Sequence, residues 1–461
     1  MFIGRKKELN VLKSMYNKNG FQMAVVYGRW HIGKTALLNE FIKDKDALFF
    51  SAEETTEALN LQKFSNILGR KLGIADFPCA SDWQELFFII KEQLGQRHII
   101  IAIDEYPLLA SANSDMNSIL QQTIDHNFAD TNIFLILCGS SISFMEDQVL
   151  DEKSPLYNRC TGQLKILPLD YYDAAKFYPK ASAEDKIKYY ACFGGTPCYL
   201  SQINKNLVFD ENVNNLFFQI DGQLLKEGNL LMEREFSEPS KHNVVLQAIA
   251  SGANTFKEIM TFTNLDNDVL LAHLDALQDL NYIVRIMPCG SNPFRSRKAR
   301  YLLYENFIAF WYRYVYPHIT EIELGNGDIY ADFALKNLSN FISNNFKEVT
   351  TQFLKRLNAK SALPFVAKSF GKWWGKGYDT TPQEIDVVVE SISGEDVIIG
   401  ECKWRKFHKL NSVIEWLRSR VETFNDLNCY QYLFTKDPIK MDANTNITNI
   451  TINKYFSAEL E

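Results

Sequence analysis

The feature that most constrains the fold is a glycine-containing loop between an apolar segment and a helical segment. Residues 28–35 read GRWHIGKT and fit the pattern GxxxxGK[ST], directly after the apolar run Gln22–Tyr27. The two glycines allow backbone N–H groups to turn inward, and the positive end of a following helix adds to their attraction for phosphate oxygens. The strand–loop–helix context makes the match specific and predicts a phosphate-binding loop.

Individual residues of this loop have distinct expected roles. Lys34 can reach the β- and γ-phosphates of a nucleotide, and Thr35 can hold Mg²⁺. We therefore expect ATP and Mg²⁺ as cofactors. The expected nucleotide-binding residues of this segment are Gly28, Arg29, Trp30, His31, Ile32, Gly33, Lys34, Thr35 and Ala36.

Further apolar runs accompany the loop in the first third of the chain. They cover residues 47–51, 99–103, 133–138 and, more briefly, 164–167, with helical stretches between them. Continuous apolar strands separated by helices are typical of a parallel sheet buried on both faces. We expect an α/β fold of the P-loop ASCE type, with helices on both faces of the sheet.

An acidic pair follows the third apolar run. Asp104 stands at the carboxyl end of that run, where a carboxylate can bind Mg²⁺ through a water. Glu105 points to the other side and can act as the base for an attacking water. A pair that caps a helix is the alternative. Ser140 ends the next strand, where it can orient water or sense the γ-phosphate, and a simple turn serine is equally compatible.

Composition excludes several classes of protein. Of 461 residues, 49 are Lys or Arg and 56 are Asp or Glu, which gives a formal net charge of −7. This excludes a histone-like protein that binds nucleic acid by bulk charge, but not a local basic groove. No apolar run approaches the ~20 residues of a membrane helix. The charged start and the 8 scattered cysteines lead us to expect a cytoplasmic protein with reduced thiols.

The middle of the chain predicts a winged helix. Residues 241–288 read as three helices and a strand, with a wing at about residues 288–298. The third helix, residues 265–280, carries four aspartates and no lysine or arginine, so it is ill suited to a DNA groove. The wing is basic, with Arg295, Arg297, Lys298 and Arg300. Either the wing contacts phosphates or this domain packs on the first one as a switch.

A second candidate site lies in the last third of the chain. If the apolar segments 384–389 and 397–402 pair about the turn at Gly394, Asp386 falls near Glu401, and Lys403 shares the face of Glu401. Two close carboxylates suit Mg²⁺ or Mn²⁺, with Glu348 on the preceding helix as a third ligand. Such a metal can activate water against a phosphodiester. An amphipathic hairpin with a charged solvent face is the alternative.

A basic cluster follows this hairpin and can hold a phosphate backbone. A solvated helix cap is equally compatible with the same charges. The cluster consists of Lys403, Arg405, Lys406, His408 and Lys409.

Three short segments give the first two thirds of the chain a family resemblance. Residues 2–8 (FIGRKKE), 156–159 (LYNR) and 194–197 (GGTP) are similar to motifs of the archaeal-type ATPases and their STAND relatives, which are AAA-like P-loop proteins. The resemblance implies that Ile3, Gly4, Arg5 and Pro197 lie at the nucleotide and that Arg159 senses phosphate. Lysines occupy positions 6 and 7, although an acidic residue is usual at position 6.

The last third resembles the nuclease-like DUF234-type domain that often follows such ATPases. Its Asp386, Glu401 and Lys403 match the D…ExK core of the PD-(D/E)xK nuclease superfamily, and residues 373–375 (WWG) resemble the approach to its first strand. The resemblance implies Asp386 and Glu401 as metal ligands with the helical acid Glu348, and a catalytic Lys403. An inactive nuclease fold that retains these residues is a further option.

These observations predict four parts. They are a P-loop ATPase core (1–180), a helical extension (181–238), a winged helix with an aromatic helix (239–320) and a nuclease-like domain (321–461). We expect ATP hydrolysis coupled to a metal-dependent DNA nuclease, with ATP, DNA and a second copy of the chain as partners and no membrane. The alternatives are a STAND-like regulatory switch whose last domain only binds nucleic acid or protein, and a small-molecule kinase.

Overall fold

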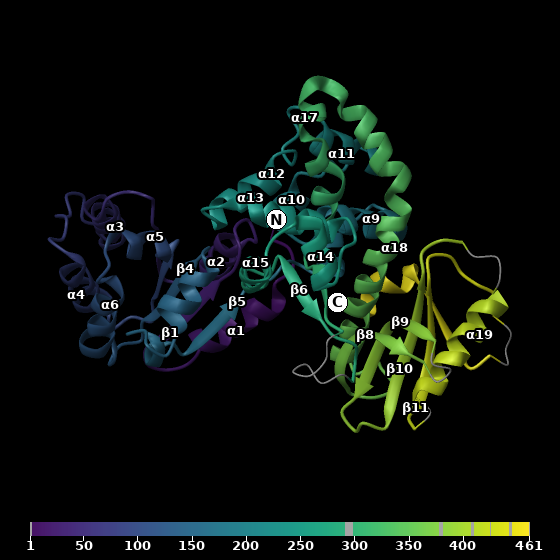
Figure 1. Ribbon diagram of the computed structural model, residues 1–461. Helices are drawn as coiled ribbons and strands as arrows, with labels where there is room; N and C mark the ends of the chain where they lie inside the picture. The colour runs from purple at the N-terminus through teal and green to yellow at the C-terminus, as the bar shows by residue number, and fades with distance from the viewer. Residues whose placement is uncertain are drawn as a thin grey trace. The chain divides into compact units, whose positions relative to one another are not determined.

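The computed structural model describes residues 2–290, 298–377, 381–406, 410–424, 426–441 and 445–460 (Figure 1). These residues form two compact units. The first unit holds residues 1–168 and 196–198, and the second holds residues 169–195 and 199–461.

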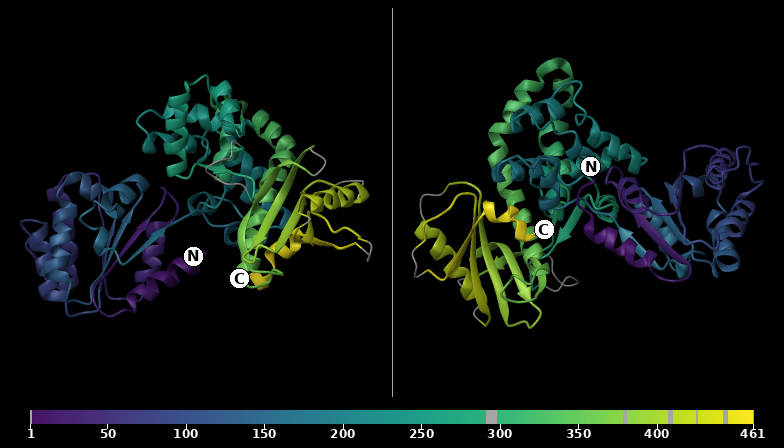
Figure 2. Two further views of the ribbon diagram at one scale, coloured as in Figure 1. Left: turned by 60° about the horizontal axis from the view of Figure 1, so that its bottom comes forward. Right: turned by 180° about the vertical axis from the view of Figure 1, so that it is seen from behind.

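The first unit is built on a parallel sheet of five strands in the order β2–β3–β4–β1–β5, with helices on both sides (Figure 2). The predicted parallel sheet is confirmed. The strands are β1 (Gln22–Tyr27), β2 (Ala47–Ser51), β3 (Ile100–Asp104), β4 (Phe134–Gly139) and β5 (Gly162–Lys165). The helices are α1 (Lys6–Tyr16), α2 (Lys34–Ile42), α3 (Glu57–Leu72), α4 (Trp83–Leu94), α5 (Tyr106–Ala112), α6 (Met116–Thr123) and α7 (Ile142–Phe144), with short helical turns at 124–128, 145–150 and 157–159.

Alternate side chains of each strand serve the two faces of this sheet. On one face, Val26 of β1 lies in a cluster with Leu12 of α1 and Phe41 of α2. From β2, Phe50 stacks on Phe64 of α3 with ring centroids 4.8 Å apart. Because both faces are covered by apolar helix surfaces, the strands must be apolar throughout, which is the pattern that the sequence shows.

The second unit begins with short helices that pack around an aromatic segment. Trp311 is fully buried, and its indole Nε1 donates to the carbonyl oxygens of Leu224 and Leu225, each at 3.0 Å. A Cβ atom on Gly228 would lie 2.3 Å from the Trp311 ring, so glycine is required there. The helices are α8 (Tyr171–Ala174), α9 (Ala183–Phe193), α10 (Pro197–Ser201, whose first two residues belong to the first unit), α11 (Phe209–Val213), α12 (Glu227–Glu235), α16 (Asn306–Phe310) and α17 (Ile319–Glu321), with helical turns at 175–177, 214–218, 311–315, 316–318 and 322–326.

Between α12 and α16 lie three helices followed by an antiparallel hairpin. The sequence predicted the three helices and the first strand within residues 241–288, but not the second strand of the hairpin. The elements are α13 (Pro239–Ala250), α14 (Phe256–Thr263), α15 (Asn267–Asp279), β6 (Ile283–Ile286) and β7 (Arg300–Leu303). Most of the predicted wing, with Arg295 and Arg297, lies outside the described residues.

A 33-residue helix, α18 (Gly327–Ala359), leads into the last sheet and is the long green helix of Figure 1. The segment that leads into this helix is helical with a local break at Gly325, whose φ is +93°. A Cβ atom on Gly327 would lie 1.6 Å from the carbonyl oxygen of Phe218, so this glycine permits close packing rather than a flexible connection.

The last sheet has five strands in the order β12–β11–β10–β9–β8. Strands β8, β9 and β10 are antiparallel, whereas β10, β11 and β12 are parallel. The sequence predicted β9 and β10 but not the edge strands β8 and β12. The bounds are β8 (Ala367–Lys376), β9 (Pro382–Ser391), β10 (Asp396–Lys403), β11 (Asn428–Thr435) and β12 (Ile447–Thr451), with helix α19 (Leu410–Val421) and turns at 422–424, 452–456 and 458–460.

Candidate functional site

The predicted phosphate-binding loop lies between β1 and α2, at the carboxyl edge of the first sheet. Its two glycines are required by the backbone. Gly33 has φ +91°, and a Cβ atom on Gly28 would lie 2.4 Å from the carbonyl oxygen of Ile166. Two residues other than glycine, His31 in the loop and Glu105 after β3, also have positive φ, at 63° and 52°. Such angles are unfavourable for residues with a Cβ atom and concentrate at functional sites.

Lys34 is buried within this loop. Its side-chain Nζ donates to the carbonyl oxygens of Gly28 and Arg29, both at 2.9 Å. The residue is only 4% exposed. An ammonium group in this position brings a full positive charge to the backbone amides of the loop and the N-terminus of α2, which is an arrangement that attracts phosphate.

The hydroxyl of Thr35 joins the loop to strand β3. Its Oγ1 donates to Oδ2 of Asp104 at 2.6 Å, and Asp104 is 1% exposed. The two side chains supply hydroxyl and carboxylate oxygens, the donor type that Mg²⁺ prefers, so they fit this ion. Burial raises the pKa of the neighbouring Cys138 thiol, and the negative charge of Asp104 raises it further. That thiol therefore stays protonated beside the carboxylate.

Glu105 lies next to this pair. Its backbone N–H donates to Oδ1 of Asp104 at 3.1 Å. Its side-chain Oε1 accepts a hydrogen bond from Oγ of Ser140, at the end of β4, at 2.6 Å. The predicted residues of β3 and β4 are thus brought together, with Ser140 fixing the orientation of the Glu105 carboxylate.

Two of the segments that carry the family resemblance also lie at the loop. Arg5 is buried, and its guanidinium donates to the carbonyl oxygen of Ile32 at 3.0 Å and pairs with Glu8 at 3.0 Å. A Cβ atom on Gly33 would lie 3.5 Å from Cγ of Pro197. The Arg5 side chain therefore stabilises the loop through its hydrogen bond to the backbone of Ile32. Ile3 and Gly4 precede it and are half-buried.

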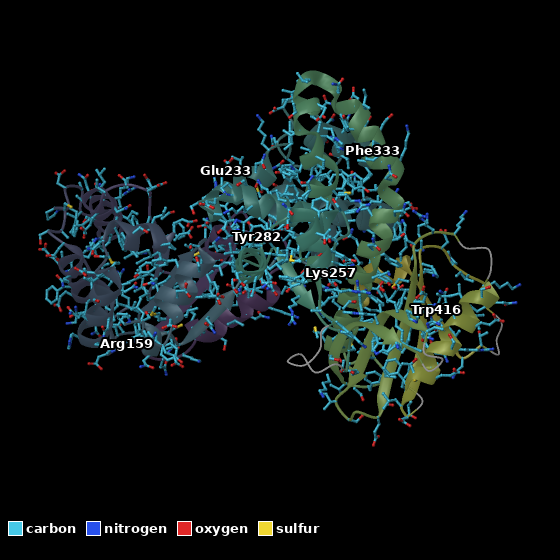
Figure 3. All side chains as sticks on the ribbon, in the orientation of Figure 1. Arg159, Glu233, Lys257, Tyr282, Phe333 and Trp416 are labelled. Atoms are coloured by element: carbon cyan, nitrogen blue, oxygen red, sulfur yellow. The ribbon has the colours of Figure 1, made fainter. Side chains whose placement is uncertain are left out.

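Arg159, the predicted phosphate sensor, makes a different contact. Its guanidinium donates to both carboxylate oxygens of Asp125, at 3.0 and 2.7 Å, and to the carbonyl oxygen of Pro155 at 3.2 Å. The hydrogen bonds from Arg159 lower the pKa of Asp125. Figure 3 labels Arg159 at the edge of the first unit. Its role toward phosphate stays a prediction.

The second candidate site lies where β9 and β10 pair. Gly400 pairs with Val387, and the same register continued by one residue places Asp386 opposite Glu401, as the sequence predicted. Burial and the neighbouring Asp386 raise the pKa of Glu401 to about 7, against the opposing effect of Lys403. Lys403 contacts Oε1 of Glu401 at 2.5 Å. The predicted set of Asp386, Glu401 and Lys403 therefore converges.

The helix contributes a different residue from the one expected. Lys347 of α18 contacts Oδ1 of Asp386 at 2.5 Å, whereas Glu348 is exposed. Burial alone would lower the pKa of Lys347, but the Asp386 and Glu384 carboxylates outweigh it and raise the pKa. Among the described residues, no group of three or more His, Cys, Asp or Glu side chains is placed to hold a metal ion.

Sequence reasoning also missed Lys372, on the unpredicted strand β8. Burial lowers its pKa, and the nearby Lys347 lowers it further. Neither lysine stands out in the sequence, because Lys347 is one of many helical lysines and β8 contains two internal glycines that obscure its strand pattern.

The basic residues that we singled out have several environments. Arg300 of β7 pairs with Oε2 of Glu384 at 3.0 Å and lies over the Trp374 ring at 4.5 Å, so this strand packs on the last sheet. Arg405 is exposed, with its Nε donating to Ser339 at 3.3 Å, and Lys406 is also exposed. His408 and Lys409 lie outside the described residues.

Comparison with known proteins agrees with the geometry of the first site. A family described as "ATPase domain predominantly from Archaea" matches residues 2–203, and DUF234, described as "Archaea bacterial proteins of unknown function", matches residues 311–413. The uncharacterised protein MJECL04 of Methanocaldococcus jannaschii is 32% identical over 405 residues, which cover 88% of each chain. This chain belongs to the archaeal-type ATPases with a C-terminal DUF234 domain. The resemblance to archaeal-type ATPases with a C-terminal DUF234 domain is confirmed. The nuclease-like character of that domain stays a prediction.

Two further comparisons place parts of this archaeal-type ATPase. The uncharacterised ATP-binding protein MJ0423 of the same organism is 40% identical over 45 residues, or 10% of this chain and 76% of that protein. The solved Walker-type ATPase PABY2304 of Pyrococcus abyssi has a TM-score of 0.52 at 19% identity and covers 68% of this chain and 96% of its own. The latter likeness supports the fold. No described helix has the length and apolar character needed to cross a membrane.

Proposed function

We propose that the first unit binds ATP with Mg²⁺ and hydrolyses it. The observation that carries the proposal is the 2.6 Å hydrogen bond between Thr35 and Asp104 directly beside the buried Lys34. It connects the phosphate-binding loop to the acidic end of β3, the two places where an ATPase needs a cation ligand and a base. The membership in an ATPase family and the ATP-binding name of the short relative support the same activity.

In this proposal the chain's own groups divide the work. Backbone amides of residues 28–34 and the Lys34 ammonium bind the phosphate oxygens, while Thr35 and Asp104 hold Mg²⁺. The metal, when bound, neutralises charge on the β- and γ-phosphates. Glu105 accepts a proton from water as the water oxygen bonds to the γ-phosphorus and the bond to the bridging oxygen of ADP breaks. ADP and inorganic phosphate leave, and Glu105 returns the proton to solvent. Ser140 keeps the Glu105 carboxylate oriented.

The test compares Lys34→Ala with Lys43→Ala in the full-length chain. Lys43 follows the end of the same helix and is exposed, so it is a matched control. Calorimetry with Mg-ATP should show binding by the wild type and the control but weak or no binding by Lys34→Ala. Phosphate release should follow the same order. Binding of Mg-ATP that survives Lys34→Ala would contradict the site, and ADP formation without phosphate release would favour the kinase alternative.

For the C-terminal domain, we propose DNA binding under the control of the nucleotide state, as in the STAND-like alternative. The observation in favour is that Lys347, rather than a third carboxylate, contacts Asp386. Lys403 and the exposed Arg405 and Lys406 offer cations for a phosphate backbone. A cytoplasmic location and assembly with a second copy of the chain remain parts of this proposal.

Metal-dependent DNA cleavage by Asp386, Glu401 and Lys403 is the second candidate, because these three side chains converge as the nuclease resemblance implies. Two assays separate the candidates. A gel shift with and without Mg-ATP reports binding, and nicking of supercoiled DNA with Mg²⁺ or Mn²⁺ reports cleavage. Nicking that Asp386→Asn abolishes would establish the nuclease and refute a purely binding role.

A further inference from the structure

The carboxylate pair of the C-terminal domain, Asp386 and Glu401, already has hydrogen-bond and ion-pair partners within the protein. Asp386 accepts from Lys347 at Oδ1, at 2.5 Å, and from the backbone N–H of Cys402 at Oδ2, at 3.1 Å. Glu401 accepts from Lys403 at Oε1. Both acids are buried, at 6% and 7% exposure. A buried carboxylate needs such partners, since an unpaired charge in this environment is costly.

Packing of α18 fixes which residue faces this pair. Phe346 lies against the rings of Trp404 and Tyr455, with centroids 5.5 and 5.7 Å away. One turn later, Thr350 is fully buried and its Oγ1 hydrogen-bonds the hydroxyl of Tyr455 at 2.8 Å. Residues three or four apart share a helix face, so Lys347 lies on the face of Thr350. Glu348, the next residue, is exposed, and its charge acts on Lys372 of β8.

Lys347 also lies near a second carboxylate of β9. Glu384 lies 4.0 Å from the same Lys347 ammonium, and the pKa of Lys347 responds to both Asp386 and Glu384. A divalent cation of the Mg²⁺ type needs several oxygen ligands at short range, typically six around Mg²⁺. Among the described residues, no third His, Cys, Asp or Glu side chain is placed with Asp386 and Glu401 to hold a metal ion, and one Asp386 oxygen already contacts an ammonium.

We propose that Lys347 is an internal counter-ion that keeps the Asp386–Glu401 pair free of divalent metal. A cation reaches this pair only by displacing the Lys347 ammonium from Asp386. The nuclease-like domain of this chain is therefore a metal-free fold in its resting state, and cleavage would require that α18 or Lys347 move. This inference concerns the C-terminal site alone and stands or falls independently of ATP hydrolysis.

The test is a Mn²⁺ titration of the nucleotide-free, full-length chain, followed by the electron paramagnetic resonance signal of free Mn²⁺. Lys347→Gln removes the counter-ion, and Lys355→Gln, an exposed lysine two turns later on α18, is the matched control. We expect Lys347→Gln to gain one Mn²⁺ site at least about tenfold tighter than any in the wild type, because its carboxylates lose their competing cation. The gain should disappear in Lys347→Gln with Asp386→Asn, whereas Lys355→Gln should behave as the wild type.

Two results would overturn the inference. One is a wild-type Mn²⁺ site that Asp386→Asn abolishes, which would show that Lys347 does not exclude the ion. The other is a folded Lys347→Gln chain that binds no additional Mn²⁺. If Lys347→Gln does not fold, as judged by circular dichroism, the comparison of the wild type with Asp386→Asn still decides the question. Failure of ATP hydrolysis alone would leave this result unchanged, so the two proposals fail separately.

Discussion

Replacing Glu105 by glutamine should slow ATP hydrolysis by about 10²–10⁴-fold while leaving ATP binding intact. The substitution keeps the size of the side chain and its carbonyl oxygen, so Ser140 can still donate to that oxygen, as it does to Oε1 at 2.6 Å. The backbone at this position has φ +52°, and glutamine meets the same conformational cost as glutamate. The change therefore removes the base and little else.

The expected magnitude follows from the role of one group. A positioned general base contributes about 10²–10⁴-fold, which corresponds to roughly 3–5 kcal/mol of activation free energy at about 1.4 kcal/mol per factor of ten. Binding should change by less than about threefold, since the residues proposed to bind the phosphates and the metal, Lys34, Thr35 and Asp104, are not altered.

The assay is phosphate release under saturating Mg-ATP, with binding measured in parallel by calorimetry. Ser140→Ala is the matched control, because it removes the hydrogen bond to Oε1 but leaves the carboxylate. We expect an intermediate loss of turnover for Ser140→Ala. A Glu105→Gln chain that hydrolyses ATP within about threefold of the wild type would exclude Glu105 as the base. Equal losses of binding and turnover would instead indicate a structural role.

Two further predictions concern the second unit. Arg356→Met should lower the free energy of unfolding by about 2 kcal/mol in urea denaturation, because the charge-assisted hydrogen bonds to both Asp170 oxygens, at 2.6 and 2.7 Å, are lost. The control Lys355→Met should leave the urea midpoint unchanged. An unchanged midpoint for Arg356→Met would contradict the prediction. Burial lowers the pKa values of His242 and His273 in the folded chain. As the pH falls, these histidines therefore take up protons at a higher pH in the unfolded chain than in the folded chain. The free energy of unfolding should fall as the pH drops through about 6.5. His273→Asn should weaken that loss between pH 7.5 and 5.5, and an identical loss in both chains would refute the assignment.

Much of the first unit could be predicted from local sequence. The apolar runs of β1 and β2 have the bounds that their residues suggest, and the ends of β3 and β4 carry Asp104, Glu105 and Ser140 to one edge. This succeeds because parallel strands end at the same side of a sheet, so residues that follow separate strands meet there. Arg5 was found through its motif, but its contact with the loop carbonyl of Ile32 was not.

The C-terminal sheet was harder to predict. The register of β9 and β10 follows from their turn, and it places Asp386 opposite Glu401 as expected. The edge strands β8 and β12 were missed. An edge strand has a neighbouring strand on one side only, and its pattern of apolar residues is weaker. Lys372, which lies on β8, was missed with it.

The sequence by itself determined the glycines and the lysine of the phosphate-binding loop, the strands that surround it and the pairing of two carboxylates with Lys403. Only the tertiary structure decided that Lys347, and not Glu348, meets Asp386. One step along a helix turns a side chain by about 100°, so the choice between neighbours depends on how the helix is rotated. That rotation is set by the packing of Phe346 and Thr350 against Tyr455, more than a hundred residues away in the chain, which no local pattern encodes.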